Sequence, residues 1–252
     1  MKQVKGIILI ISCQKHKETR LKDFKLKNTN YNNWEVIYVI GDLFLNENYM
    51  LNDNILYVKS EDSYVHLIKK QVLAIKYLYE LFIIEEGILR CCDDLIFNED
   101  KLMTFLTSEK YDYYGQSPDQ QNICYTDLNQ LKKTVNSTWI SDYYKVHPED
   151  LDNPYHNLTN IKIENYVKIP NVCGAAGPIM YLSNKACKIL VNHMENINYD
   201  VFAYDIFTEC YPYTIDDVAI SFIMYMNNIA FTHNSNMYDT NEAIAIHTNR
   251  YK

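Results

Sequence analysis

The sequence contains no long hydrophobic run and no cluster of basic residues. A membrane-spanning helix needs roughly 18–20 consecutive apolar residues, and no segment of the 252-residue chain approaches that length. No basic block is longer than Lys69-Lys70 or Lys132-Lys133, and 24 Lys and Arg against 32 Asp and Glu give a net charge of −8. Proteins that grip a nucleic-acid backbone need many cationic contacts. Nucleic acid is therefore the least favoured partner, and we expect no membrane span.

The cysteines also lack the patterns that mark disulfide scaffolds. They are odd in number, spread over the chain and without a CxxC pair, unlike the dense frameworks of small secreted domains. The apolar stretch from Gly6 to Cys13 is too short for a signal peptide and has no small-residue cleavage site. We therefore expect buried, reduced thiols in a cytoplasmic protein. The seven residues are Cys13, Cys91, Cys92, Cys124, Cys173, Cys187 and Cys210.

The N-terminal third has the pattern of an α/β fold, because β-branched runs alternate with helical periodicity. We expect strands over Val4–Ser12, Trp34–Gly41 and Asn54–Val58. From Ile68 to Phe82, apolar residues recur every three or four positions, which predicts a long amphipathic helix. A further buried strand is expected over Gly87–Cys92. Since single cores stop growing at roughly 250–300 residues, we expect one domain over residues 1–252.

The remainder of the chain is less regular. From Gln116 to residue 168 the periodicity fails and the segment is polar and rich in tyrosine; such long irregular segments are usually functional or mobile. Order returns at residue 169, followed by Gly174-Ala175-Ala176-Gly177, the chain's only cluster of small residues. Asn98, Ser183 and Asp216 each mark the start of a predicted helix.

Two adjacent aspartates, Asp93 and Asp94, directly follow the predicted strand Gly87–Cys92. Open α/β sheets place their ligands at the carboxyl ends of strands, and carboxylate oxygens suit Mg²⁺ or Mn²⁺ bridging a diphosphate. Repulsion between the two charges is on the order of 4 kcal/mol at roughly 4 Å and an effective dielectric near 20, and a divalent cation would reverse it. The pair indicates a metal site, with a capped polar turn as the competing interpretation.

Three other features could carry chemistry. Asp216-Asp217 opens a predicted helix, where the macrodipole favours acids without any catalytic role, yet an ionised carboxylate there could act as a general base. The Gly174–Gly177 segment has neither a P-loop nor a dinucleotide pattern, which leaves a close backbone approach to a ligand or a simple tight turn. His233 and His247 could complete a metal shell, although a single histidine is more often a surface or packing residue.

In their order along the chain, these segments resemble the galactosyltransferase-like family, which includes β1,3-galactosyltransferases, β1,3-N-acetylglucosaminyltransferases and Fringe. Arg90 to Asn98 is similar to the family's Lys-Thr-Asp-Asp-Asp-Val-Phe-Val-Asn segment. Asp62 to Lys69 is similar to its Asp-Ser-Tyr, Asn-Leu, Lys run before a long helix. Pro170 to Ser183 resembles its Pro-x-x-Cys-Ser-Gly-Gly-Gly segment ending in Leu-Ser, and Asp216 to Val218 its Glu-Asp-Val.

The resemblance implies a GT-A fold, with a central and mostly parallel sheet flanked by helices, and a function. The function is inverting, β1,3-type transfer of a hexose or N-acetylhexosamine from a UDP-sugar to a hydroxyl of a glycan or glycoconjugate, with Mn²⁺ or Mg²⁺ as cofactor. Residues 1–115 would bind the nucleotide sugar, 116–168 would be an irregular insertion, and 169–252 would form the acceptor half. The resemblance implies that Asp94, with His247 or His233, binds the metal. It implies that Asp217 is the general base, with Asp216 beside it. The residues implied to bind the donor are Arg20, Arg90, Asp93, Gly174, Ala175 and Gly177.

Two departures from the family pattern keep other functions open. Cys92 stands where the family has its first Asp, and Ala175-Ala176 replace glycines. One alternative is a phosphoesterase in which the two aspartate pairs grip two metal ions. The other is a relative that binds a sugar or nucleotide without catalysis. The donor sugar, the acceptor and the oligomeric state are not indicated by the sequence.

Overall fold

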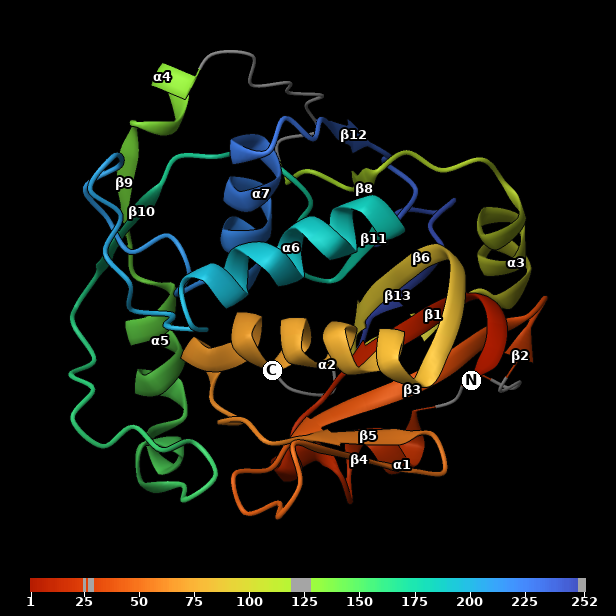
Figure 1. The fold of residues 1–252 in the computed structure, drawn as a ribbon, viewed down its shortest axis with the longest axis horizontal. Coiled ribbons are helices and arrows are strands. Elements are labelled where there is room, and N and C mark those ends of the chain that lie inside the picture. The colour runs from red at the N-terminus through yellow and green to blue at the C-terminus, as the bar shows by residue number, and fades with distance from the viewer. Residues whose placement is uncertain (25, 27–29, 119–127, 249–252) are drawn as a thin grey trace.

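The computed structural model describes residues 1–24, 26, 30–118 and 128–248, and Figure 1 shows its fold. One large sheet has the strand order β12-β8-β11-β6-β1-β3-β5-β4, with β2 also paired to β3. Two small sheets pair β9 with β10 and β7 with β13. The strands are β1 (Lys2–Ile11), β2 (Asn30–Tyr31), β3 (Trp34–Gly41), β4 (Tyr49–Asn52), β5 (Ile55–Val58), β6 (Phe82–Cys92), β7 (Leu95–Phe97), β8 (Tyr113–Gly115), β9 (Thr134–Ser137), β10 (Val167–Pro170), β11 (Ile179–Ser183), β12 (Phe231–His233) and β13 (Ala245–His247).

Helices cover both faces of the large sheet. The helices are α1 (Arg20–Asp23), α2 (Leu67–Leu81), α3 (Glu99–Thr107), α4 (Leu128–Leu131), α5 (Trp139–Val146), α6 (Asn184–Asn196) and α7 (Asp216–Met226), with the 3-10 turns η1 (Gln14–His16), η2 (Tyr64–His66) and η3 (Pro148–Asp152). Successive residues of β1 point to opposite faces. Ile7 and Leu9 pack with α2, α6 and α7, whereas Ile8 and Ile10 pack with α3 and β13. Figure 1 shows α2 and α6 side by side on the first face.

The large sheet is mixed, so the prediction of a mostly parallel sheet is wrong. In the described part of the chain, four of its strand pairs are parallel and four are antiparallel. The main cause is β11, which enters antiparallel between β6 and β8. The sequence analysis predicts no strand over Ile179–Ser183. The α/β class itself is confirmed.

The predicted local signals agree closely with the structure. The Asn98 side chain accepts a hydrogen bond from the Lys101 amide at 3.2 Å, and the Ser183 side chain accepts one from the Ala186 amide at 3.2 Å. Both bonds satisfy orphan donors at helix starts. The long helix predicted from Ile68 is α2, but β6 begins at Phe82, five residues before the predicted strand.

The prediction of an irregular segment from 116 to 168 is wrong in part. Its described residues contain α4, β9, α5 and η3. Ile140 and Tyr144 of α5 pack with Val65, Ile169 and Ile215 in a small third core. Elements of four to eight residues are too short to show a clear hydrophobic period.

The described cysteines are all free thiols. Cys91, Cys187 and Cys210 are buried, as expected, whereas Cys13, Cys92 and Cys173 are partly exposed. The prediction for Cys124 concerns a position outside the described residues. In the described part of the chain, no helix has both the length and the apolar character that crossing a membrane requires.

Candidate functional site

A cavity of about 750 Å³ opens at the carboxyl ends of β1 and β6. These strands are parallel neighbours, with Ile11 of β1 in register with Cys92 of β6. The cavity lies where open α/β sheets place ligands. Its lining residues are Ile11, Ser12, Cys13, Lys15, His16, Thr19, Arg20, Asp62, Ser63, Tyr64, Leu67, Lys70, Arg90, Cys92, Asp93, Asp94, Tyr143 and His147.

Asp93 is buried and holds three side chains at the cavity wall. Its Oδ2 accepts hydrogen bonds from Ser12 Oγ at 2.6 Å and pairs with His16 Nδ1 at 3.1 Å. Its Oδ1 accepts a bond from Arg20 Nη1 at 3.1 Å. Burial alone would raise the pKa of Asp93, but the bonds from His16 and Ser12 hold that pKa below its ordinary value. Asp93 therefore stays ionised and positions His16 and Arg20.

Asp94 differs from its neighbour because part of its carboxylate is unsatisfied. Its Oδ1 is buried and has no hydrogen-bond partner among the described residues. The backbone around it is fixed, since the Asp94 carbonyl accepts a 2.8 Å bond from the Thr248 amide. A buried carboxylate oxygen without a partner is costly. Asp94 thus lines the cavity with a buried carboxylate oxygen that a cation could bind without displacing a described partner.

The two candidate histidines lie in different places. His247 ends β13, which pairs with β7, so that His247 is in register with Leu95, the residue after Asp94. His247 Nδ1 lies 2.5 Å from Asp239 Oδ2, and this carboxylate orients the ring, as carboxylates commonly orient histidines that bind metals. His233 lies on β12, three strands from β6, where its Nδ1 accepts a 3.0 Å bond from the Ser117 amide.

Arg90 lies on β6, three residues before Asp93, and forms an ion pair with Asp216. Its side chain is buried, and Nη2 donates to Asp216 Oδ2 at 2.6 Å while Nε donates to Gln71 of α2 at 3.2 Å. Nη1 lies 3.2 Å from Cys92 Sγ. Burial is the main reason that the pKa of the Cys92 thiol is raised to about 12, although the nearby guanidinium lowers it. Cys92 therefore stays neutral and does not replace the acidic residue that the family carries.

Asp217 follows Asp216 at the start of α7 and is partly buried. Its Oδ2 accepts a 3.0 Å bond from the Gly177 amide. Burial and then the Asp216 charge raise the pKa of Asp217 to about 6. The charges of Asp216 and Asp217 also raise the pKa of Tyr64, which lines the cavity, after burial as the main cause. The acidic pair thus adjoins Arg90, which lines the cavity, without lining the cavity itself. Asp217 can take up a proton near pH 6.

The small-residue segment contributes packing more than lining. A Cβ on Gly174 would lie 2.1 Å from Ser221 Oγ, so glycine is needed where this segment crosses α7. Ala175 is buried, and its amide donates to Tyr113 Oη at 2.9 Å. Neither residue is among those that line the described cavity. Only Gly177, through its amide bond to Asp217, touches a candidate catalytic group.

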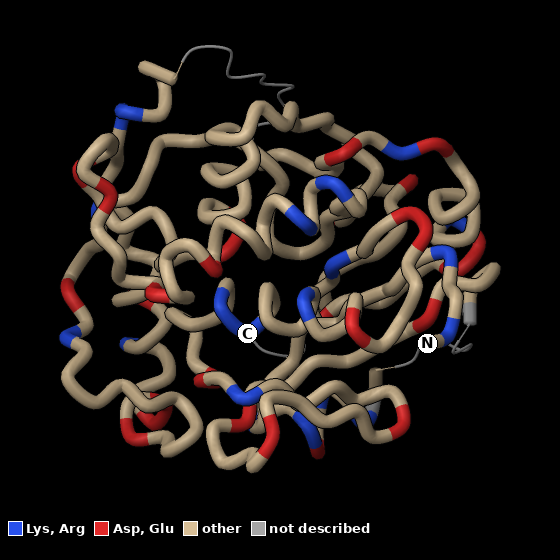
Figure 2. Tube along the Cα trace, viewed as in Figure 1, with Lys and Arg blue, Asp and Glu red and all other residues tan. Residues whose placement is uncertain are grey.

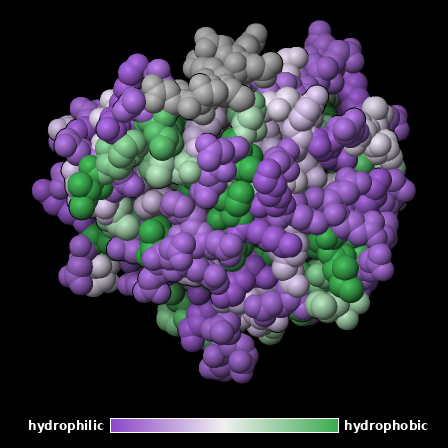
Figure 3. Space-filling model, turned by 45° about the horizontal axis from the view of Figure 1, so that its top comes forward, coloured by the Kyte–Doolittle hydropathy of each residue, from purple (hydrophilic) through white to green (hydrophobic). Residues whose placement is uncertain are grey.

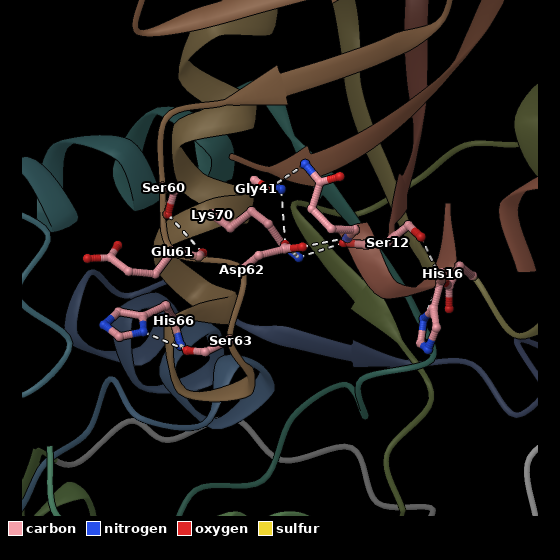
Figure 4. Close-up of polar contacts among 11 residues, drawn as sticks. Ser12, His16, Gly41, Ser60, Glu61, Asp62, Ser63, His66 and Lys70 are labelled. Carbon is pink, nitrogen blue, oxygen red and sulfur yellow. Dashed lines mark hydrogen bonds and ion pairs between the residues drawn. The ribbon is translucent and has the colours of Figure 1, made fainter. Parts of the chain in front are cut away.

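A buried ion pair supports the cavity floor (Figure 4). Lys70 Nζ donates to Asp62 Oδ1 at 2.7 Å and to the Ser12 carbonyl at 2.6 Å. Asp62 also accepts bonds from the amides of Gly41 and Gln14, at 3.0 and 2.6 Å. The pair therefore ties α2 to the carboxyl ends of β1 and β3. Lys69, the last residue of the segment that resembles the family, takes no part in this buried pair. It makes a partly exposed pair with Glu61.

Sequence reasoning missed several cavity residues. Lys15 and His16 are in η1, directly after β1, and the rule that ligands bind at strand carboxyl ends could have found them. Tyr64 and Tyr143 stack with ring centroids 4.5 Å apart and an interplanar angle of 8°. No sequence signal pairs these two tyrosines, because Tyr143 comes from the segment predicted to be irregular.

A second group of possible ligands lies at the cavity rim. His147, Glu149 and Asp150 have ligand atoms within 4.8 Å of one another. Lys15 Nζ already lies 2.7 Å from Glu149 and 3.2 Å from Asp150, and Tyr143 donates to Asp150 at 2.7 Å. Lys15 and Tyr143 thus already bind oxygens of these two acids. In the described part of the chain no other three His, Cys, Asp or Glu side chains lie this close.

The geometry defines an α/β protein with a cavity at the carboxyl ends of two central strands of a mixed sheet, lined by both acidic and basic side chains. Scans of the chain against protein-family models and against curated proteins return no match. The family resemblance therefore rests on the motifs themselves.

Proposed function

We propose that the protein is a metal-dependent, inverting glycosyltransferase. It would move a hexose or N-acetylhexosamine from a UDP-sugar to a hydroxyl of a glycan or glycoconjugate. The observation that carries the proposal is the 2.6 Å bond from Arg90 to Asp216. Arg90 lines the cavity together with Asp93 and Asp94, so this bond supports a site at which a donor and a general base could meet. A GT-A fold and a cytoplasmic location are parts of the same proposal.

The donor's diphosphate would bind at the nitrogen-bearing side chains of η1 and α1. Lys15, His16 and Arg20 line the cavity at the carboxyl end of β1. Asp93 holds His16 and Arg20 in place without being exposed itself. Planar guanidinium groups and lysine ammonium groups are the usual partners of phosphate oxygens. Asp93 would thus act by positioning His16 and Arg20.

The residues present fit a divalent cation. Asp94 Oδ1 is a buried oxygen without a partner among the described residues. The pairing of β13 with β7 puts His247 opposite Leu95, the residue that follows Asp94. The hard metals Mg²⁺ and Mn²⁺ commonly take one or two protein ligands and complete their shell with water and substrate phosphates. Asp94 and His247 would hold the ion. When bound, it would neutralise negative charge on the departing diphosphate.

Asp217 would act as the general base. With a pKa raised to about 6, it is ionised at neutral pH and more basic than an ordinary aspartate. General bases work best when their pKa lies near the working pH. Gly177 and Val218 donate to the carboxylate through their amides, which fixes its orientation. In-line attack by an acceptor hydroxyl that gives its proton to Asp217 would invert the anomeric centre.

A panel of nucleotide sugars tests the function and separates it from the alternatives. The thermal midpoint should rise with one UDP-sugar in the presence of Mn²⁺, because preferential binding stabilises the folded state by mass action. The same donor should then yield UDP and a glycosylated product only when an acceptor is present. Release of inorganic phosphate without an acceptor would instead identify a phosphoesterase. Binding without turnover over a broad set of acceptors would identify a non-catalytic relative, and either result contradicts the proposal.

A further inference from the structure

An exposed apolar loop lies apart from the residues that line the cavity. The loop runs from Tyr204 to Tyr211 and is closed by the backbone bonds between Asp205 and Cys210, at 3.0 and 3.4 Å. At its tip Ile206 is 84% exposed, and the ring of Phe207 is 37% exposed. The ring centroids of Tyr204 and Tyr211 lie 5.3 Å apart, and both side chains are exposed. An isoleucine this exposed gains nothing from folding, so the loop presents it to an outside partner or to water.

Two further segments extend this surface. Lys132 Nζ lies 4.9 Å from the centre of the Phe207 ring, which brings the end of α4 to the loop. The Tyr211 amide donates to the Lys168 carbonyl at 3.0 Å, which joins the loop to β10, and β10 pairs with β9. Val135 of β9 and Trp139, which starts α5, are 42% and 69% exposed. Figure 3 shows hydrophobic residues gathered on the side of the molecule where Figure 1 places α4, β9 and β10.

The apolar surface is bordered by cations in a protein that is acidic as a whole. Lys132, Lys133 and Lys168 have no acidic partner in the described part of the chain. Figure 2 shows basic residues directly after α4, next to β9. The acids of the same loop are Asp205 and Glu209, and Asp205 Oδ1 already accepts two bonds from Thr208. Among the described residues this surface thus has three lysines against two acids, and on a chain of net charge −8 this favours an anionic partner.

We propose that this surface, formed by Val135, Trp139, Tyr204, Ile206, Phe207 and Tyr211 with the three lysines at its border, docks onto an anionic lipid membrane. Aromatic residues with one polar end prefer the headgroup region, and lysines near it are attracted by acidic lipids. A sugar chain would use the rings but would gain nothing from the aliphatic Ile206. A protein partner would bury the aromatics but would not by itself explain why Ile206 is 84% exposed at the tip of the loop. Insertion of Ile206 and Phe207 below the headgroups explains both.

The inference does not depend on the proposed transferase activity, but it has a consequence for the cavity. Trp139 and Tyr143 lie one turn apart on α5, about 6 Å along its axis at 1.5 Å per residue. Trp139 belongs to the docking surface, whereas Tyr143 lines the cavity. Docking would therefore hold the cavity close to the headgroup layer, so that a lipid-linked substrate could reach it.

Vesicle sedimentation with the full chain tests the proposal. The wild type should sediment with vesicles in which about a third of the lipid is phosphatidylglycerol, and much less with pure phosphatidylcholine. Added salt should weaken the binding. Ile206→Ser should lower the partition coefficient about tenfold, as expected for one exposed isoleucine that becomes buried. Lys132→Gln and Lys168→Gln should each lower it about fivefold.

Matched controls carry the same changes outside the surface. Ile83→Ser alters another exposed isoleucine, and Lys59→Gln with Lys188→Gln removes two exposed lysines. The controls should bind vesicles as the wild type does, and all variants should keep the wild-type thermal midpoint. Absence of vesicle binding, or equal losses in the control and surface variants, would overturn the proposal. A dimer that forms without lipid and is lost in Ile206→Ser would show a second copy of the chain as the occupant instead.

Discussion

The Arg90 guanidinium donates to the Asp216 carboxylate at 2.6 Å, in a buried pair that spans 126 residues of sequence. Arg90 belongs to β6, three residues before Asp93, and Asp216 begins α7. A buried ion pair needs good geometry to offset its desolvation cost. Here the pair fixes the start of α7 against the end of β6. It keeps the Asp216-Asp217 pair next to Arg90, which lines the cavity together with Asp94.

Removing the basicity of Asp217 should stop transfer without preventing donor binding. Asparagine keeps the shape, and its amide oxygen can still accept the bond from the Gly177 amide. We expect Asp217→Asn to lower kcat by about 10²–10⁴, the usual contribution of a general base, and to leave donor affinity within a few-fold. The measurement is product formation by mass spectrometry beside calorimetric donor binding. Asp53→Asn, an exposed acid in the turn between β4 and β5, is the control, and transfer at the parental rate in Asp217→Asn would refute the assigned role.

The transfer rate should fall on the acidic side with the pKa of Asp217. The base must be ionised, and burial with the Asp216 charge raises the pKa of Asp217 to about 6. We expect kcat/KM to be constant above about pH 7 and to fall tenfold per pH unit below about pH 5. A profile recorded with saturating Mn²⁺ gives the result. An acidic limb centred near pH 4 would show that the base is an ordinary, solvated carboxylate.

The same raised pKa makes a prediction for stability. A carboxyl whose pKa is higher in the folded than in the unfolded chain contributes stability at low pH that is lost as the pH rises from its ordinary value of 3.8 through about 6. Asparagine does not ionise, so Asp217→Asn does not lose this stability as the pH rises. The variant should be more stable than the wild type by about 1–3 kcal/mol at pH 7.5, with a much smaller difference near pH 4. Urea unfolding at both pH values provides the comparison, and equal differences at the two values would speak against the raised pKa.

Much of the local structure could be predicted from sequence, because strong local signals carry it. The caps at Asn98 and Ser183, the helix α2 and the buried strand β1 follow from capping chemistry and hydrophobic period. The position of Asp93 and Asp94 at the end of a strand also follows from the sequence. These features depend on residues within a few positions of one another.

The remaining features depend on contacts between distant segments. The β7–β13 ladder consists of two three-residue strands, which have no period, yet it is what brings His247 next to Leu95. The antiparallel entry of β11 and the stacking of Tyr64 on Tyr143 likewise leave no local signal. Arg90 was predicted to bind the donor, but its partners Gln71 and Asp216 come from two other helices. Sequence reasoning identified the residue and not its main contacts.

Substitution of the buried Lys70 should lower the free energy of unfolding far more than substitution of its neighbour Lys69. Lys70→Met leaves Asp62 as an unpaired buried carboxylate, although two amide bonds to it remain. We expect a loss of about 3–5 kcal/mol in the free energy of unfolding. Lys69→Met breaks only the partly exposed pair with Glu61 and should cost at most about 1 kcal/mol. Chemical denaturation of the two variants decides the point, and similar losses would mean that the Lys70–Asp62 pair does not support the cavity floor.

Calorimetric titration of UDP with and without Mn²⁺, in the wild type and in Asp94→Ala, tests the central claim most directly. If the cavity is a metal-dependent nucleotide-sugar site, Mn²⁺ should tighten UDP binding by at least about tenfold in the wild type, and Asp94→Ala should abolish that gain because the cation loses its carboxylate ligand. A wild type that does not bind UDP, or an Asp94→Ala variant that keeps the full effect of Mn²⁺, would contradict the account.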